Sequence, residues 1–217
     1  MENTATNPKK KSKVYSSQKI RKLTVTAILA AVSAVLMFLD FSVPFMPGFI
    51  KMDLSDMPAL IASFAFGPLS GVGVCLIKNL INLFTTTTGG VGELSNFILG
   101  CMLVIPAGLI YKRKKNRKFA LLGSLVGAVC MAGMSFLTNY FIVYPIYTNF
   151  MPIEQIIAAY QAILPRVTAL WQALLIFNVP FTFIKGMLCA LITFLVYKPL
   201  SPILKGNTTD KHFVCNY

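Results

Sequence analysis

The sequence predicts an all-α integral membrane protein with six transmembrane helices, the second of them short, and with both termini in the cytoplasm. Two observations predict this fold class. Of the 217 residues, 56% are hydrophobic and 12% are charged, which is too few charges to cover a soluble domain of this length. In addition, apolar runs at 23–39, 119–137 and 186–197 have the character of membrane helices or parts of them.

Basic residues form clusters that flank the apolar runs. Seven of the twenty Lys and Arg residues lie within 1–22, six lie within 112–118, and three more lie after residue 197. Because Lys and Arg mark cytoplasmic segments, we expect all of these clusters on the cytoplasmic side, with an even number of crossings between successive clusters. The net charge of +13 then reflects topology and contact with anionic membrane lipid, and argues against nucleic acid as a partner.

The same clusters divide the chain into regions. Residues 1–18 are expected to form a disordered basic cytoplasmic tail, because they are polar and rich in Lys and Ser. Residues 19–200 are expected to form one six-helix substrate-binding domain in the membrane, and 201–217 a second cytoplasmic tail.

Four helices are expected before the basic loop at 112–118. The second is only about half of the roughly 20 residues that a full span needs. Gly67-Pro68 separates it from the third helix, because proline lacks an amide hydrogen and clashes with the preceding turn. A single kinked helix over 57–84 is the alternative, but it gives an odd number of crossings. The expected helices lie at about 23–40, 56–67, 68–84 and 93–111.

Two further helices, at about 119–144 and 168–197, follow the basic loop. The outer connections are then 41–55, 85–92 and 145–167. Within the last of these, apolar residues recur at helical spacing over 153–164. This pattern predicts an amphipathic helix that either covers the mouth of the bundle as a lid or rests on lipid.

Polar side chains interrupt the apolar sequence between 49 and 96. Such groups are costly at membrane depth, so they usually face a partner, a cavity or a ligand. Ser55 or Asp56 is placed to cap the second helix, and Glu93 is placed where a carboxylate meets the positive end of the fourth helix. Glycines beside Thr85–Thr88 would let the chain approach a ligand closely.

A polar stripe marks the last predicted helix. Asn178, Thr182 and Lys185 fall at i, i+4 and i+7 on one helical face. We expect Lys185 either to contact a ligand or to form a buried ion pair with an acid from another helix.

Small residues mark the first predicted helix. Ala27, Ala30, Ala31 and Ala34 form two interleaved small-xxx-small pairs, which allow helices to approach closely in lipid. This face is expected either to dock a partner membrane protein or to pack inside the bundle.

Several catalytic signatures are missing from the sequence. It contains no G-x-x-x-x-G-K-[ST] loop, no H-E-x-x-H and no serine elbow. The single histidine, His212, lies near the end of the chain, and the five cysteines form no C-x-x-C pair. We therefore expect no metal site, no cofactor and no ATP hydrolysis by this chain.

Several longer strings resemble a known family. They are PxxPxFIKMDLSDMPALIASFAFGPLSG, IKNLIN, TTTTGGVGELSNF, YKRKKNRK, LTNYFIVYPIY and VPFTFIKG. In this order, over roughly 23–198, they resemble the riboflavin-specific substrate-binding (S) component of energy-coupling factor (ECF) transporters. The resemblance implies a bundle in the bacterial plasma membrane that takes riboflavin, the transported ligand, from outside. It also implies a transmembrane coupling subunit and two cytoplasmic ATPases as partners, and a toppling motion that releases the vitamin inside.

The resemblance further implies substrate-binding roles, which we carry over motif by motif. This family often has Asn where Thr182 stands, and a hydroxyl cannot reproduce the paired hydrogen bonds of an amide, so Asn178 is a possible substitute. Asn139 and Asn149 compete for one role. The implied substrate-binding residues are Lys51, Met52, Asp53, Thr87, Thr88, Gly89, Gly90, Glu93, Asn96, Asn139, Asn149, Asn178, Thr182 and Lys185.

Three alternatives remain open at the sequence level. In the first alternative, the protein is the same kind of transport component but its ligand is FMN, a flavin analogue such as roseoflavin, or another vitamin. In the second, it is a membrane-embedded enzyme that acts on a lipid or isoprenoid through Asp53, Asp56 and Glu93. In the third, it is a structural scaffold that docks through the alanine face of its first helix.

Overall fold

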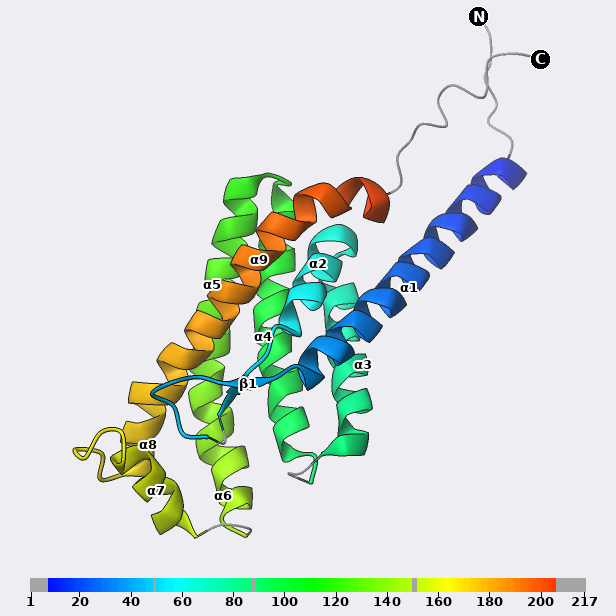
Figure 1. Ribbon diagram of the computed structural model, residues 1–217. Coiled ribbons are helices and arrows are strands. Elements are labelled where there is room, and N and C mark those ends of the chain that lie inside the picture. Colours follow the sequence, from blue (N-terminus) through cyan, green and yellow to red (C-terminus); the bar gives the residue numbers. More distant parts are fainter. Residues whose placement is uncertain (1–7, 49, 87–88, 150–151, 206–217) are drawn as a thin grey trace, which may run out of the picture.

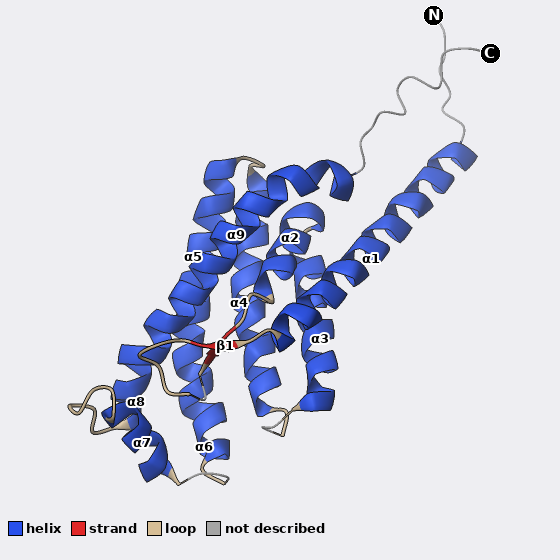
Figure 2. Cartoon of the chain, viewed as in Figure 1, coloured by secondary structure: helices blue, strands red, loops and turns tan. Residues whose placement is uncertain are grey.

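The computed structural model is a bundle of long helices with one short two-stranded ribbon (Figures 1 and 2). It describes residues 8–48, 50–86, 89–149 and 152–205. In chain order the elements are α1 (Pro8–Phe38), β1 (Phe41–Ser42), β2 (Lys51–Met52), α2 (Asp56–Phe66), α3 (Pro68–Asn82), the 3₁₀-helix η1 (Leu83–Thr85), α4 (Val91–Arg113), α5 (Arg117–Thr138), the π-helix η2 (Asn139–Val143), α6 (Tyr144–Tyr147), α7 (Ile153–Gln161), α8 (Leu170–Ala173), the π-helix η3 (Leu174–Asn178) and α9 (Val179–Lys205).

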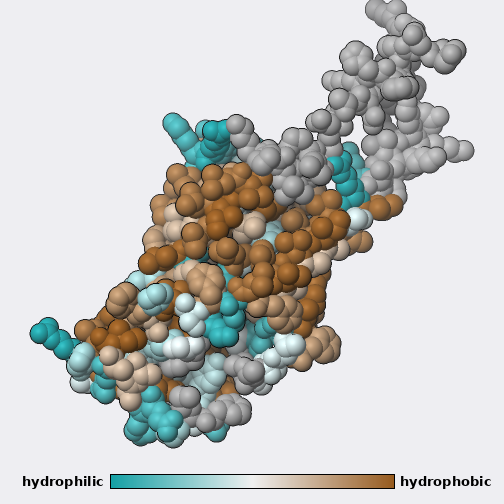
Figure 3. Space-filling view, viewed as in Figure 1, coloured by the Kyte–Doolittle hydropathy of each residue, from teal (hydrophilic) through white to brown (hydrophobic). Residues whose placement is uncertain are grey.

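Five helical stretches are long and apolar enough to cross a membrane, and α2 is a shorter apolar helix. On the face that Figure 3 shows, hydrophobic side chains form a broad band over the helices, and hydrophilic side chains gather toward its two ends. These features confirm the prediction of a helical membrane protein. The candidate spans are Gln18–Phe38, Pro68–Thr85, Val91–Arg113, Arg117–Tyr147 and Leu170–Tyr197.

The two ends of the bundle carry different elements. The start of α1, the connection between α4 and α5, and the end of α9 lie together at the top of Figure 1. At the bottom lie α6, α7, α8 and the turn between α3 and α4. The described parts of the basic segments, 8–22, 112–118 and 198–205, therefore share one end, as the sequence predicts.

The predicted break between the second and third helices is confirmed. Gly67 has a φ of +98°, which favours glycine, and its amide donates to the Ser63 carbonyl at 2.9 Å. Pro68 is the first residue of α3, where its missing amide hydrogen is of no consequence. The short α2 is held by packing, since it contacts α1, α3, α4 and α9, and its Ala59 and Leu60 are fully buried.

The N-terminal region differs from the expected disordered tail. α1 begins at Pro8, so much of the 1–18 segment is helical, while residues 1–7 lie outside the described part. Lys and Gln are good helix formers, and an established apolar helix extends into them at little cost. At the other end α9 continues to Lys205, and the rest of the expected tail, 206–217, also lies outside the described residues.

Two π-helical segments interrupt the last long helices. η2 ends two residues before Pro145, and η3 ends two residues before Pro180. Proline removes an intrahelical hydrogen bond and crowds the carbonyl four residues earlier, and a wider turn relieves that crowding. The first residue of η2 is Asn139 and the last residue of η3 is Asn178, so both widened turns carry an amide side chain.

The connection between α1 and α2 contains a ribbon that the sequence analysis did not predict. β1 and β2 pair antiparallel, with Phe41 opposite Met52 and Ser42 opposite Lys51. The Lys51 ammonium lies 3.1 Å from the Asp40 carboxylate across this ribbon. The residues that follow the ribbon enter the interior of the bundle, where Asp53, Ser55 and Asp56 are buried.

Candidate functional site

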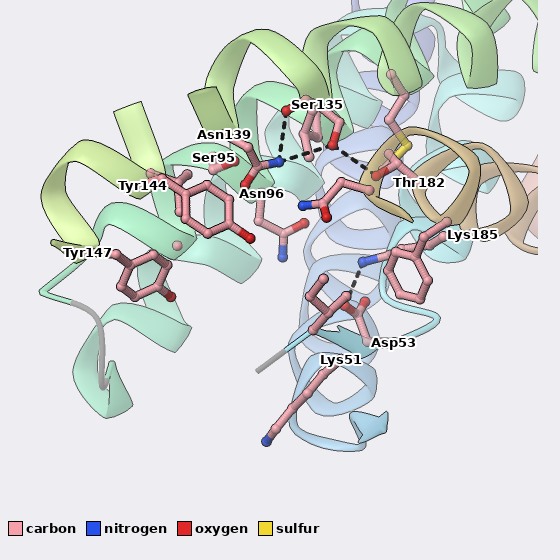
Figure 4. Close-up of a pocket in the computed structure, with 17 residues that line it drawn as sticks. Lys51, Asp53, Ser95, Asn96, Ser135, Asn139, Tyr144, Tyr147, Thr182 and Lys185 are labelled. Carbon is pink, nitrogen blue, oxygen red and sulfur yellow. Dashed lines mark hydrogen bonds and ion pairs between the residues drawn. The ribbon is translucent and has the colours of Figure 1, made fainter. Parts of the chain in front are cut away.

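A cavity of about 220 Å³ lies between the ribbon and the lower halves of α4, α5 and α9 (Figure 4). Both polar and apolar side chains line it, as in pockets that combine an apolar body with a few orienting hydrogen bonds. Its volume is below the roughly 300–1,000 Å³ typical of small-molecule sites. The lining residues are Ile50, Lys51, Asp53, Gly92, Ser95, Asn96, Leu99, Met131, Ser135, Asn139, Val143, Tyr144, Tyr147, Asn178, Phe181, Thr182 and Lys185.

Ser135 on α5 joins two predicted site residues. Asn139 Nδ2 donates to the Ser135 carbonyl at 2.8 Å and to Ser135 Oγ at 3.1 Å. Thr182 Oγ1 donates to the same Oγ at 3.0 Å, across from α9. Because both hydrogens of the Asn139 amide are directed at Ser135, its Oδ1 is left as an acceptor for the cavity that Asn139 lines.

Lys185 forms the buried ion pair that was one of its two expected roles, and it also lines the cavity. Its ammonium lies 2.7 Å from Asp53 Oδ2, both side chains are 9% exposed, and both residues line the cavity. The Ser55 amide donates to the other Asp53 oxygen at 2.9 Å. Burial alone would raise the pKa of Asp53, but the charges of Lys185 and Lys78 hold that pKa below its ordinary value. The Asp53 carboxylate is therefore charged at neutral pH.

A second buried ion pair lies behind the first. Lys78 Nζ is 2.6 Å from Asp56 Oδ1 and 2.6 Å from Ser55 Oγ, and neither Lys78 nor Asp56 is exposed. Asp56 Oδ2 has no hydrogen-bond partner within the described part of the chain, and the Lys185 ammonium lies 3.9 Å away. Two lysines and two aspartates thus form one neutral cluster, which makes the burial of each charge tolerable.

This cluster corrects the expected cap of the second helix. Ser55 is the residue before α2, but its backbone is helical and no side-chain cap bond is formed. Asp56 is already inside the helix and pairs with Lys78. Hydrogen bonds from a charged ammonium are stronger than those from the backbone amides of a first turn. The Ser55 hydroxyl and the Asp56 carboxylate therefore accept hydrogen bonds from Lys78 and do not cap α2.

The fourth helix begins as predicted near Glu93, but Glu93 is not among the residues that line the cavity. It lies in the first turn of α4 and is 8% exposed. Its carboxylate accepts hydrogen bonds from Asn82 Nδ2 at 3.1 Å and Thr86 Oγ1 at 2.9 Å. The residue that precedes the helix is Gly90, with a φ of +88°.

The remaining candidates are divided by the structure. Asn96, Asn139, Asn178 and Thr182 line the cavity, as do Lys51, Asp53 and Lys185. Asn149 is exposed and lies outside the lining, which separates it from its competitor Asn139. Met52 is the buried residue of β2, and Gly89 and Gly90 form the turn before α4; none of these three lines the cavity. Thr87 and Thr88 lie outside the described residues.

A chain of hydroxyl groups connects α7 to the cavity wall. Tyr160 Oη lies 2.6 Å from Tyr144 Oη and donates to Asn178 Oδ1 at 2.8 Å. Tyr160 is fully buried, and it packs with Ile156 against residues of α6, α8 and η3. The predicted amphipathic helix is therefore confirmed as α7 and is anchored by its apolar face.

Sequence reasoning missed several lining residues. Ser95, Ser135, Tyr144 and Tyr147 were not singled out. Ser135 stands four residues before Asn139, so helical spacing was a usable signal for it. Tyr144 and Tyr147 had no such signal, because the π-helix η2 rotates them relative to an ordinary α-helix.

The alanine face of α1 is split by the bundle. Ala30 and Ala34 are 1% and 5% exposed and pack inside. Ala27 and Ala31 are exposed. Internal packing thus accounts for one small-xxx-small pair, and the other pair remains on the outer surface of α1.

Comparisons with known proteins agree on one family. Residues 21–197 match the family described as "ECF transporter, substrate-specific component". The chain is 31% identical over 188 residues to the riboflavin transporter RibU of Staphylococcus aureus, covering 87% of this chain and 94% of the relative. It is 31% identical over 187 residues to the riboflavin transporter FmnP of Bacillus subtilis, covering 85% and 94%.

A solved structure of the S component of a bacterial ECF transporter matches this structure with a TM-score of 0.68 at 30% identity, covering 86% of this chain and 99% of that one. With its apolar helices, this chain is a multi-pass protein of the cell membrane. It belongs to the family of substrate-specific components of ECF transporters.

Proposed function

We propose that the chain captures riboflavin at the outer face of the membrane and delivers it to an ECF coupling module. The observation that carries this proposal is the cavity, in which Asn139, Asn178 and Lys185 converge from three separate elements. Relatives at 31% identity are named riboflavin transporters, which supports the choice of ligand.

The cavity chemistry suits a flavin. The isoalloxazine ring is a flat apolar body with a polar edge of two carbonyls and an N–H group. Leu99, Met131 and Phe181 offer apolar surface for the ring. Donors at Asn178 and Lys185 and an acceptor at Asn139 complement the polar edge. Lys51, Asp53, Asn96 and Thr182 also line the cavity and are proposed to contact the ligand there. Met52, Gly89, Gly90 and Glu93, together with Thr87 and Thr88 outside the described residues, are proposed to contact the part of the ligand that extends beyond it. Of the two competitors, Asn139 is proposed to take the role instead of Asn149.

The size of the cavity bears on how far the ligand reaches. At about 220 Å³ it is small for a whole flavin, so the ligand would extend past the ribbon toward the turn before α4. That turn and the ribbon belong to outer connections of the proposed topology. In this topology six helices, including the short α2, form the bundle, and both termini are cytoplasmic.

Membership of the family supports a proposal about the partners. We propose a transmembrane coupling subunit and two cytoplasmic ATPases, which supply the ATP hydrolysis for which this sequence has no P-loop. The exposed Ala27 and Ala31 form a smooth strip on α1 against which a partner helix can pack closely. The carboxylates of the enzyme alternative are instead engaged: Asp53 and Asp56 in ion pairs, and Glu93 in hydrogen bonds.

A binding titration tests the proposal. The protein is purified in detergent and riboflavin is added while its fluorescence is recorded. We expect saturable quenching, with FMN and roseoflavin competing more weakly or not at all. A protein that leaves riboflavin fluorescence unchanged would refute the proposal, and stronger quenching of FMN would move the assignment to that flavin.

A further inference from the structure

A second hollow, which we call the lateral groove, lies at the end of the bundle where α6, α7 and α8 gather (Figure 1). Its volume is about 410 Å³, and residues of η2, α6, α7 and α8 contribute to its lining. Among the described residues, Tyr144 alone lines both this groove and the cavity of the candidate site. The lateral groove is therefore a separate space that has one wall in common with that cavity.

The walls of the lateral groove are mostly apolar. The rings of Tyr140 and Phe141 pack edge to face, with their centres 5.1 Å apart. Pro145, Ile153 and Leu170 add aliphatic surface. The groove thus offers an occupant van der Waals contact more than hydrogen bonds.

Most of the hydroxyl groups in the lining are engaged within the protein. Thr148 Oγ1 donates to the Pro145 carbonyl at 2.7 Å, and Tyr144 Oη is paired with Tyr160 Oη at 2.6 Å. The remaining hydroxyl of the described lining belongs to Tyr140, which is 39% exposed. Apolar hollows favour hydrocarbon over water, since an engineered apolar cavity of about 150 Å³ stays dry and binds benzene.

The lateral groove is continuous with the lipid-facing surface of the protein. Phe141 lies near the end of the candidate span Arg117–Tyr147, and the other candidate span at the groove, Leu170–Tyr197, begins with a lining residue. Both spans therefore reach the membrane boundary at this groove. Phe141 is 67% exposed, and Leu137, one turn earlier on α5, is 46% exposed. The apolar surface thus extends from the groove onto a helix face that lipid covers.

We propose that the lateral groove binds an acyl chain of a membrane phospholipid. Lipid already covers the adjoining surface, and its chains are as apolar as the aliphatic side chains of the lining. A flavin is a poorer match, because the polar edge of its ring would lose its hydrogen bonds to water there. The bound chain lies against Tyr144, on the wall that the groove shares with the cavity.

The single tryptophan of the chain, Trp171, allows one indole to be moved to a chosen place. One reporter variant, Phe141→Trp/Trp171→Phe, carries its indole in the lining of the lateral groove. The matched reporter, Leu137→Trp/Trp171→Phe, carries it on the exposed surface of α5, outside that lining. The full-length variants are purified in detergent, and phosphatidylcholine with brominated acyl chains is added while indole fluorescence is recorded. Bromine quenches an indole only at close approach, so the signal shows where the acyl chain lies.

We expect the fluorescence of the reporter at position 141 to fall in a saturable phase that is complete when lipid and protein are equimolar. The reporter at position 137 should lose fluorescence gradually, in proportion to the share of brominated lipid in the micelle. Excess unbrominated phosphatidylcholine should reverse the saturable phase, and riboflavin should not.

A pair of matched variants tests the location of the lipid. Ile153→Phe places a larger side chain in the lateral groove, whereas Ile146→Phe makes the same change outside its lining. The two isoleucines are 38% and 37% exposed. In the position-141 reporter, Ile153→Phe should weaken the saturable phase by about tenfold or more, because the lipid competes with a side chain for the same space. Ile146→Phe should leave this phase unchanged. Leu170→Phe blocks the groove from α8 and replaces Ile153→Phe if that variant does not fold.

Three results would overturn this inference. Equal, gradual quenching of both reporters would mean that the lateral groove binds no lipid. A saturable phase that persists in the blocking variants would place the lipid elsewhere on this surface. Reversal by riboflavin but not by phosphatidylcholine would assign the groove to the flavin. A protein that binds lipid in the groove but binds no riboflavin would refute the proposed function alone.

Discussion

At the residue scale, the site depends on charges that are buried only because they are paired. Lys185 lies 132 positions after Asp53 in the sequence, and yet their charged groups are 2.7 Å apart. Removal of one partner leaves the other charge buried alone, whereas removal of both leaves a neutral, packed site. Stability and ligand binding are therefore separable by choosing single and double substitutions.

The first prediction concerns Lys185→Met. It should lower the free energy of unfolding by about 3–5 kcal/mol, because it leaves Asp53 as an unpaired buried anion. The double variant Asp53→Asn/Lys185→Met should recover most of this stability but not riboflavin binding. Thermal unfolding in detergent and fluorescence quenching measure the two quantities. Full riboflavin affinity in the double variant would show that neither residue contacts the ligand.

The second prediction is the pH dependence that Asp53 confers. Its pKa is lowered in the folded protein, so the unfolded state binds more protons as the pH falls below about 4, the ordinary pKa of Asp. The stabilisation is complete above that pH and is lost as the pH falls toward the folded pKa. Asp53→Asn should show a shallower loss of thermal stability between pH 5 and pH 3 than the wild type, and equal slopes would contradict the prediction.

At the element scale, close helix contact is achieved by glycine. A Cβ on Gly127 of α5 would collide with the backbone carbonyl of Leu103 on α4, whereas a Cβ on Gly133, further along α5, meets nothing within 4 Å. Inside a membrane the hydrophobic effect does not drive helices together, because lipid is as apolar as the side chains. Helices associate instead through close van der Waals packing, which small residues allow. The contact between α4 and α5 thus depends on one face of α5.

The third prediction uses these two glycines as a matched pair. Gly127→Ala should destabilise the protein by roughly 1–3 kcal/mol, because backbone atoms have to move. Gly133→Ala should be neutral or stabilising by up to about 1 kcal/mol, through the better helix propensity of alanine. Unfolding midpoints in detergent compare them, and a neutral Gly127→Ala would mean that α4 and α5 are less closely packed than described.

At the scale of the whole molecule, one surface of α1 is left exposed by the bundle. Ala27 and Ala31 are exposed, and so are the larger neighbours Ile28 at 56% and Val35 at 60%. Ala30 and Ala34 face inward on the same helix. The helix therefore separates packing within the chain from packing against the proposed coupling subunit.

The fourth prediction distinguishes these two faces. Ala31→Leu should leave riboflavin binding unchanged but reduce uptake by cells that contain the coupling module. The larger side chain would prevent a partner helix from approaching this face of α1 closely. Ala30→Leu should instead lower the stability of the isolated protein by about 1–3 kcal/mol through overpacking. Binding, uptake and thermal unfolding are measured on both variants, and normal uptake by Ala31→Leu would place the partner elsewhere.

Much of the architecture followed from local patterns. Hydropathy located the long helices, Gly67-Pro68 located the break before α3, and periodicity located α7, because each of these depends on neighbours within a few turns. The helical stretch from Pro8 and the ribbon at 41–52 were missed, since helix extension and strand pairing leave weak signals in polar or proline-rich sequence.

The sequence by itself determined that the protein folds in a membrane, because its apolar helices are flanked by basic segments. It also determined that the polar residues within those helices face a partner, a cavity or a ligand, because exposure to lipid is costly. The tertiary structure alone decided which polar residues meet. In the structure, Lys185 pairs with Asp53, and Asp56 pairs with Lys78 and does not cap a helix. Asn139 lines the cavity, whereas Asn149 does not. Such choices depend on how distant helices pack, and helical periodicity carries no information about contacts between elements far apart in the chain.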